Sequence, residues 1–146
     1  MRIFKFGGAS VKDAEGYKNV GAILQKYKSE KIRPETVINA EIDANWEPYL
    51  QTPPFPEYPS GHSTISSASA EVLTAIFGDN VAFTDSTEHK YGHGVRQFKS
   101  VRQAATECSY SRLYGGIHYR SGCEQGQDSG IRIGQFVANK LGIMPK

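Results

Sequence analysis

The 146-residue sequence lacks three features that would each point to a broad class of protein. No apolar run approaches the roughly 20 residues that a membrane-spanning helix needs, so an integral membrane protein is not expected. The net charge is only +2, and no basic run is interleaved with aromatic residues, so nucleic acid is not an expected partner. Charged residues and glycines interrupt any apolar core of a secretory signal at the start, which predicts a cytoplasmic location for the sequence as written.

Cysteine is also scarce, and this limits both disulfide and metal chemistry. Cys108 and Cys123 are too few to form a disulfide framework, and neither has histidine or cysteine neighbours at metal-ligand spacing. Free thiols on half-buried helix positions are therefore expected. His89 and His93 lie in the polar run TEHKYGHG, where a metal site is one interpretation and surface histidines in a loop are the favoured one. No resident metal ion is expected.

The pattern of apolar residues and chain-breaking residues predicts a mainly α fold in a chain long enough for one domain. Helices are expected at about residues 13–32, 61–77, 100–114 and 124–141. Five prolines make residues 45–59 an extended loop, and residues 78–98 are expected to form a second long loop. Only residues 3–6 have the pattern of a strand.

The first 24 residues differ in character from the rest of the chain. A short apolar strand, the glycine pair Gly7-Gly8 and an amphipathic helix follow one another, and this order resembles the amino terminus of aspartate kinases. Glycines before a helix start suit a phosphate group. The resemblance does not continue after Leu24, and an amino-acid kinase needs a far larger domain. Residues 1–24 are therefore expected to be a leader segment rather than a domain, and an aspartate kinase fragment is the most remote of the functions considered.

Three short motifs in the remainder carry the residue types that surround a tetrahedral oxyanion such as phosphate or vanadate. They are KYKSEKIRP at 26–34, PSGH at 59–62 and SRLYGGIH at 111–118. Such an anion needs fixed cations and N–H donors, and two imidazoles allow one to attack while the other donates a proton. The residues that would surround the anion are Lys26, Arg33, Ser60, Gly61, His62, Arg112 and His118.

The spacing within the motifs supports convergence on one site. Lys26 and Arg33 are two helical turns apart and would share a helix face, which Pro34 would end or kink. Arg112 and His118 are six residues apart, which is off-face for a single helix. The two glycines between them are expected to end the helix and turn His118 back toward the site.

Together, these motifs resemble the signatures of the type 2 phosphatidic acid phosphatase/vanadium haloperoxidase superfamily over residues 25–146. The resemblance implies a partial helical bundle of the acid phosphatase/vanadium haloperoxidase type, truncated at its amino-terminal side. It implies that His118 is the nucleophile toward phosphorus or the axial ligand of vanadium, and that His62 is the acid–base group. It implies phosphate or vanadate binding by Lys26, Arg33, Ser60, Gly61 and Arg112. The run PPFPEYPSGHS is similar to vanadium chloroperoxidases and places Phe55 in the halide or substrate pocket.

One position departs from the superfamily pattern. An Asp usually follows the second histidine by four residues and orients its ring, whereas this chain has Gly122 there. Glu124 and Asp128 are the candidates to replace it.

Three functions remain open at this stage. The anion ligands are shared by a phosphomonoesterase, which needs no cofactor, and by a haloperoxidase, which needs vanadate. The expected partners are a small phosphoester, or peroxide plus a halide; relatives are often exported. The third interpretation is an inactive fragment that at most binds oxyanions, because residues 1–24 replace the helices that precede the first motif in the superfamily. An open bundle would also expose an apolar face and favour a homo-oligomer.

Overall fold

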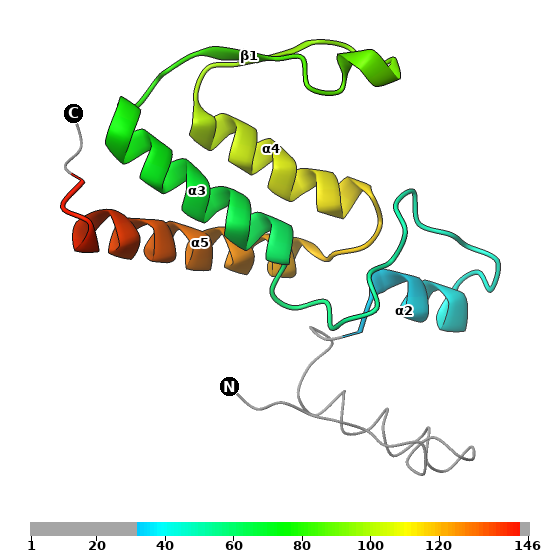
Figure 1. The fold of residues 1–146 in the computed structure, drawn as a ribbon. Coiled ribbons are helices and arrows are strands. Elements are labelled where there is room, and N and C mark those ends of the chain that lie inside the picture. The colour runs from blue at the N-terminus through cyan, green and yellow to red at the C-terminus, as the bar shows by residue number, and fades with distance from the viewer. Residues whose placement is uncertain (1–31, 144–146) are drawn as a thin grey trace.

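The computed structural model describes residues 32–143, and this part of the chain is mainly helical (Figure 1). Its three long helices, α3 (Gly61–Phe77), α4 (Val101–Tyr114) and α5 (Arg120–Lys140), pack side by side. The short helix α2 (Pro34–Glu41) lies near the end at which α3 begins. The expected partial helical bundle is confirmed.

Local sequence signals account for the limits of α3 and α4. Ser60 and Ser100 precede the two helices, and each side chain accepts a hydrogen bond from the backbone N–H three residues later. Gly78 ends α3 with a φ of 95°, a conformation that a side chain disfavours. Both helices therefore lie where the sequence predicted them, within one residue at each end.

Helix α5 carries a row of buried glycines, Gly122, Gly126, Gly130 and Gly134, of which the last three pack on α3 and the first faces Glu57. Their spacing of four residues places them on one face of the helix. A Cβ atom at Gly126 would lie 2.7 Å from the backbone oxygen of Ser60, and one at Gly134 would lie 2.5 Å from that of Ala68. Because neither distance leaves room for a side chain, the backbones of α3 and α5 meet directly.

Helix α2 was not predicted, because Pro34 was interpreted as the end of a helix rather than its start. Pro34 is the first residue of α2, where its fixed φ is helical and its missing N–H has no intrahelical acceptor. The helix predicted at 13–32 and the strand predicted at 3–6 lie outside, or almost wholly outside, the described residues.

The segment 78–98, expected to be a loop, contains a small hairpin. Strand β1 (Phe83–Asp85) pairs antiparallel with β2 (Arg96–Phe98), and the 3₁₀ turn η2 (His89–Tyr91) lies between them. The stacked rings of Phe83 and Phe98, with centroids 5.2 Å apart, form a cross-strand pair that stabilises these short strands. Strands of three residues are too short to leave an alternating pattern, so the sequence did not reveal them. Residues 45–59 contain no helix or strand, as expected.

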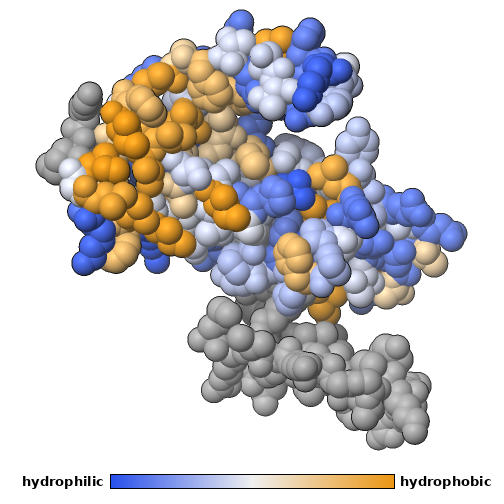
Figure 2. Space-filling model, viewed as in Figure 1, coloured by the Kyte–Doolittle hydropathy of each residue, from blue (hydrophilic) through white to orange (hydrophobic). Residues whose placement is uncertain are grey.

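One face of the bundle is apolar and exposed. Figure 2 shows hydrophobic surface gathered over the end of the bundle at which α3 ends, and Leu73, Ile76 and Phe77 are exposed large apolar residues of that helix. A groove of about 270 Å³ lies between α3 and α4, with Leu73 and Phe83 in its lining. No helix within residues 32–143 is long and apolar enough to span a membrane. An exposed apolar face was expected, and the oligomeric state stays a prediction.

Substituting Gly134 tests whether contact between the two backbones stabilises the fold. Gly134→Ala should lower the free energy of unfolding by about 1–3 kcal/mol, because the new methyl group overlaps the backbone oxygen of Ala68. This loss opposes the gain of about 1 kcal/mol that Ala usually brings to a helix. Thermal unfolding followed by circular dichroism measures the change. Gly94→Ala, where a Cβ meets nothing within 4 Å, is the control, and an unchanged midpoint for Gly134→Ala would contradict the packing.

Candidate functional site

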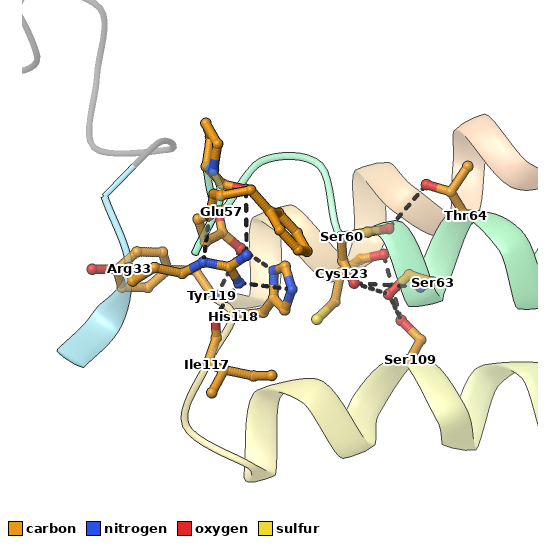
Figure 3. A network of polar contacts seen from close by, with 12 residues as sticks. Arg33, Glu57, Ser60, Ser63, Thr64, Ser109, Ile117, His118, Tyr119 and Cys123 are labelled. Atoms are coloured by element: carbon orange, nitrogen blue, oxygen red, sulfur yellow. Dashed lines mark hydrogen bonds and ion pairs between the residues drawn. The ribbon is translucent and has the colours of Figure 1, made fainter. Parts of the chain in front are cut away.

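Arg33 joins three segments of the chain at the start of α2. Its side chain is buried, with a residue exposure of 6%. Nε donates to the backbone oxygen of Phe55 at 3.0 Å, and Nη1 donates to the backbone oxygen of Ile117 at 2.7 Å (Figure 3). The same Nη1 lies 2.9 Å from Nε2 of His118. The structure thus brings together Arg33 and His118, which the sequence had assigned to one site.

Phe55 lies beside this arginine rather than at a distance from the site. The guanidinium carbon of Arg33 is 5.0 Å from the centroid of the Phe55 ring, which is a cation–π geometry. Phe55 is 55% exposed, so its ring borders both the arginine and solvent. Its assignment to a halide or substrate pocket stays a prediction.

His118 is held between Arg33 and a buried carboxylate. Helix α4 ends at Tyr114, and Gly116 with a φ of 76° turns the chain, as the sequence predicted. His118 is 3% exposed, and its Nδ1 lies 2.8 Å from Oε1 of Glu57. Because a carboxylate only accepts and a guanidinium only donates, these partners place the proton on Nδ1 and a lone pair on Nε2. The second ring nitrogen therefore faces Arg33 as an acceptor.

The carboxylate partner of His118 is Glu57, which the sequence analysis missed. The two candidates for this role are both exposed on α5: Glu124 and Asp128. Oε1 of Glu124 lies 3.9 Å from Nη1 of Arg120. Glu57 is fully buried in the loop before α3. An acidic residue within the apolar and proline-rich run PPFPEYP was the available signal, because a charge in such a run needs a specific partner.

The first turn of α3 lies next to the start of α5. The backbone N–H of Ser60 donates to the backbone oxygen of Gly122 at 3.0 Å, and its hydroxyl accepts from the hydroxyl of Ser63 at 2.8 Å. Ser60 is fully buried, whereas a Cβ at Gly61 would meet nothing within 4 Å. Within residues 32–143, the N–H groups of Gly61 and His62 have no backbone acceptor, as at any helix start. This turn therefore presents donors toward open space.

Two arginines and two histidines gather around this turn. The pKa of His62 is lowered by partial burial, by the nearby Arg112 and by His118. The pKa of Arg33 is lowered by burial; Glu57 raises it, and Arg112 lowers it further. Arg112 thus lies within electrostatic reach of both Arg33 and His62, and His118 lies within reach of His62.

Arg112 supplies the clearest sign that this cluster suits an anion. Its Nε is buried and has no hydrogen-bond partner among residues 32–143. A buried donor without a partner is costly, and a neighbouring oxyanion would satisfy it. The donors present therefore fit a tetrahedral oxyanion. Lys26, the remaining cation of the sequence prediction, lies outside the described residues.

The two cysteines and the loop histidines have no assigned role in this chemistry, although the thiol of Cys123 lies within electrostatic reach of Glu57 and Arg112. Both thiols are free; Cys108 is half-buried on α4, and Cys123 is fully buried on α5. Burial raises the pKa of the Cys123 thiol, which makes it a poor nucleophile. His89, the first residue of η2, and His93, which follows it, are both exposed.

Comparison with known proteins assigns the chain to a family. The model of the VCPO second helical-bundle domain matches residues 10–144. The chain belongs to this family. The resemblance to the phosphatidic acid phosphatase/vanadium haloperoxidase superfamily is thereby confirmed. The matched range begins within residues 1–24, and the boundary expected at residue 25 remains a prediction.

Solved structures of related enzymes agree with this assignment. The first bacterial vanadium-dependent iodoperoxidase is 57% identical, with a TM-score of 0.73 over 79% of this chain and 28% of that one. The holo-type bacterial vanadium-dependent chloroperoxidase is 21% identical, with a TM-score of 0.65 over 75% of this chain and 30% of that one. The apo-type bacterial vanadium-dependent chloroperoxidase is 23% identical, with a TM-score of 0.59 over 68% of this chain and 24% of that one. These two chloroperoxidases show the shared fold alone.

This member of the family spans less than a third of each of these chains. No curated protein matches it.

The ionisation of His62 tests whether the positive groups converge. Its pKa should lie below the ordinary value for imidazole, so His62 stays neutral to lower pH than a free histidine. Arg112→Ala removes one of the positive neighbours, and the pKa of His62 should then rise toward the ordinary value. Titration of the histidine ring protons by NMR measures both values. Equal pKa values in the two proteins would show that Arg112 does not act on His62.

Proposed function

We propose that the cluster around the first turn of α3 binds a tetrahedral oxyanion. The unpartnered buried Nε of Arg112, within electrostatic reach of His62 and Arg33, carries this proposal. A bound anion would offset the positive charges and accept hydrogen bonds from Arg112 and from the backbone at Gly61. Ser60 lies at the same turn, and Lys26 would add a further cation.

The favoured anion is vanadate, and the favoured activity is oxidation of a halide by peroxide. The 57% identity to a vanadium-dependent iodoperoxidase supports this choice over phosphate. Bound vanadate would supply a Lewis-acidic centre that activates peroxide toward attack by the halide. Arg33, Arg112 and the first turn of α3 would hold its oxygens, and Nε2 of His118 would be its nitrogen ligand.

The residues of this chain have separate tasks in such a site. The lone pair on Nε2 of His118 accepts from Nη1 of Arg33, so anion binding must replace this contact. Arg33 would then offer Nη1 to an oxygen of the anion, and its Nε, which donates to the backbone oxygen of Phe55, would hold the side chain in place. His62 is exposed and held largely neutral, so it is able to take a proton from an incoming reactant and return it.

A phosphomonoesterase is the second candidate, because the same tautomer of His118 suits attack on phosphorus. Nε2 would form a bond to phosphorus while the bond to the leaving alcohol breaks, and protonated His62 would give its proton to that oxygen. Water would then hydrolyse the phosphohistidine and release phosphate. The third candidate is a fragment without catalytic activity, in which the cluster would bind the anion but no reaction would take place.

Calorimetric titration with orthovanadate tests the anion site itself. Arg112→Ala should weaken binding about 10- to 100-fold, the usual effect of losing a hydrogen bond to a charged group. Arg132→Ala, which removes the same charge from an exposed position on α5, should leave the affinity unchanged and controls for net charge. Failure of the folded wild-type chain to bind vanadate would overturn the proposal.

Turnover assays on the same chain separate the candidate activities. With vanadate and peroxide present, the chain should oxidise iodide, and His118→Ala should abolish this activity because no nitrogen remains to hold the cofactor. Hydrolysis of p-nitrophenyl phosphate in the absence of vanadate would instead favour the phosphatase. Full activity of His118→Ala in either assay would contradict its assigned role, and binding without turnover would identify a non-catalytic fragment.

A further inference from the structure

We infer that Glu57 is the positioning residue that orients His118 and fixes its tautomer, and that Gly122 exists as glycine to make room for it. This inference rests on the proposed function, in which Nε2 of His118 is the reacting nitrogen. Glu57 lies in the loop before α3 and His118 in the segment after α4 (Figure 3), and Gly122 lies in the first turn of α5.

The contacts of Glu57 hold the imidazole in one orientation. Oε1 accepts from Nδ1 of His118 at 2.8 Å and from the backbone N–H of Tyr119 at 3.1 Å. The second contact ties the carboxylate to the backbone that carries the histidine, so the ring and its acceptor are placed together. A proton fixed on Nδ1 leaves the lone pair on Nε2, which is the form that binds or attacks an oxyanion.

The carboxylate of Glu57 occupies the space that a side chain at residue 122 would need. Gly122 is one helical turn beyond His118, where an Asp was expected. A Cβ there would lie 2.8 Å from Cδ of Glu57 and 2.9 Å from Oε2. Any side chain at residue 122 would therefore displace the carboxylate. The acidic group reaches His118 from the loop before α3 instead of from α5.

Burial of Glu57 argues against a purely structural purpose. The side chain is fully buried, and its Oε2 has no hydrogen-bond partner among residues 32–143. A buried carboxylate with an unpaired oxygen is destabilising, and an apolar side chain would fill the same space at lower cost. A requirement for a carboxylate at Nδ1 of His118 explains why the residue is acidic.

The test combines the tautomer of His118 in the chain alone with the affinity for orthovanadate. Nitrogen-15 NMR of the imidazole, assigned with His118→Ala, reports which nitrogen carries the proton. Wild type should show the proton on Nδ1. Glu57→Gln and Glu57→Ala should shift the tautomer population toward Nε2 and weaken vanadate binding about 10- to 100-fold. Glu47→Gln, an exposed glutamate in the same loop, should change neither quantity.

A double variant that moves the carboxylate from residue 57 to residue 122 provides the decisive comparison. Gly122→Asp alone should weaken binding because its side chain overlaps Glu57, whereas the double variant Glu57→Ala with Gly122→Asp should recover at least part of the affinity. A merely space-filling Glu57 predicts no such recovery.

The outcomes separate this inference from the proposed function. If Glu57→Gln folds and keeps both the wild-type tautomer and the wild-type affinity, the inference is wrong. If wild type fails to bind vanadate, the proposed function fails, while the tautomer measurement still decides the role of Glu57.

Discussion

Direct contact between the backbones of α3 and α5 is the constraint on which the rest of the structure depends. At Gly126, Gly130 and Gly134 of α5, no side chain separates the two backbones. Their contact brings the first turn of α5 against the first turn of α3, where Ser60 donates to the backbone oxygen of Gly122. Since His118 immediately precedes α5 and His62 lies in α3, the same packing sets the two imidazoles near each other. The helix contact therefore determines the geometry of the site.

Where α3 and α5 begin, the positive charges of the arginines outnumber the negative charge of Glu57. Arg33 and Arg112 face two histidines, and Glu57 is the acidic group in contact with His118. Folding this cluster without an anion costs free energy, because like charges approach in a partly dry environment. The proposed oxyanion would remove this cost, so its binding would be coupled to stability, and its affinity would include the relief of repulsion between Arg33 and Arg112.

How much the sequence revealed depended on whether a feature was local. The capping serines and the glycine that ends α3 act within a few residues, so α3 and α4 were predicted nearly to their ends. The start of α5 was missed by four residues because its N-cap residue, Tyr119, has no side-chain capping hydrogen bond and no capping type of side chain. Pro34 has two valid interpretations, and only the surrounding chain selects the start of α2. The pairing of Glu57 with His118 joins residues 61 positions apart, and no pattern within either motif specifies it. By contrast, the residues proposed to bind the anion have a recognisable order along the chain.

The shared space of Glu57 and Gly122 has an evolutionary consequence. A change at either position alone damages the support of His118: an acidic side chain at residue 122 meets Glu57, and loss of Glu57 leaves Nδ1 without its carboxylate. The path between the two arrangements thus passes through an unfavourable intermediate. Among related sequences, the two positions should change together, with glutamate accompanied by glycine and a non-acidic residue accompanied by aspartate. Such covariation would divide the family into lineages that support the same histidine from different segments of the chain, the loop before α3 or the first turn of α5.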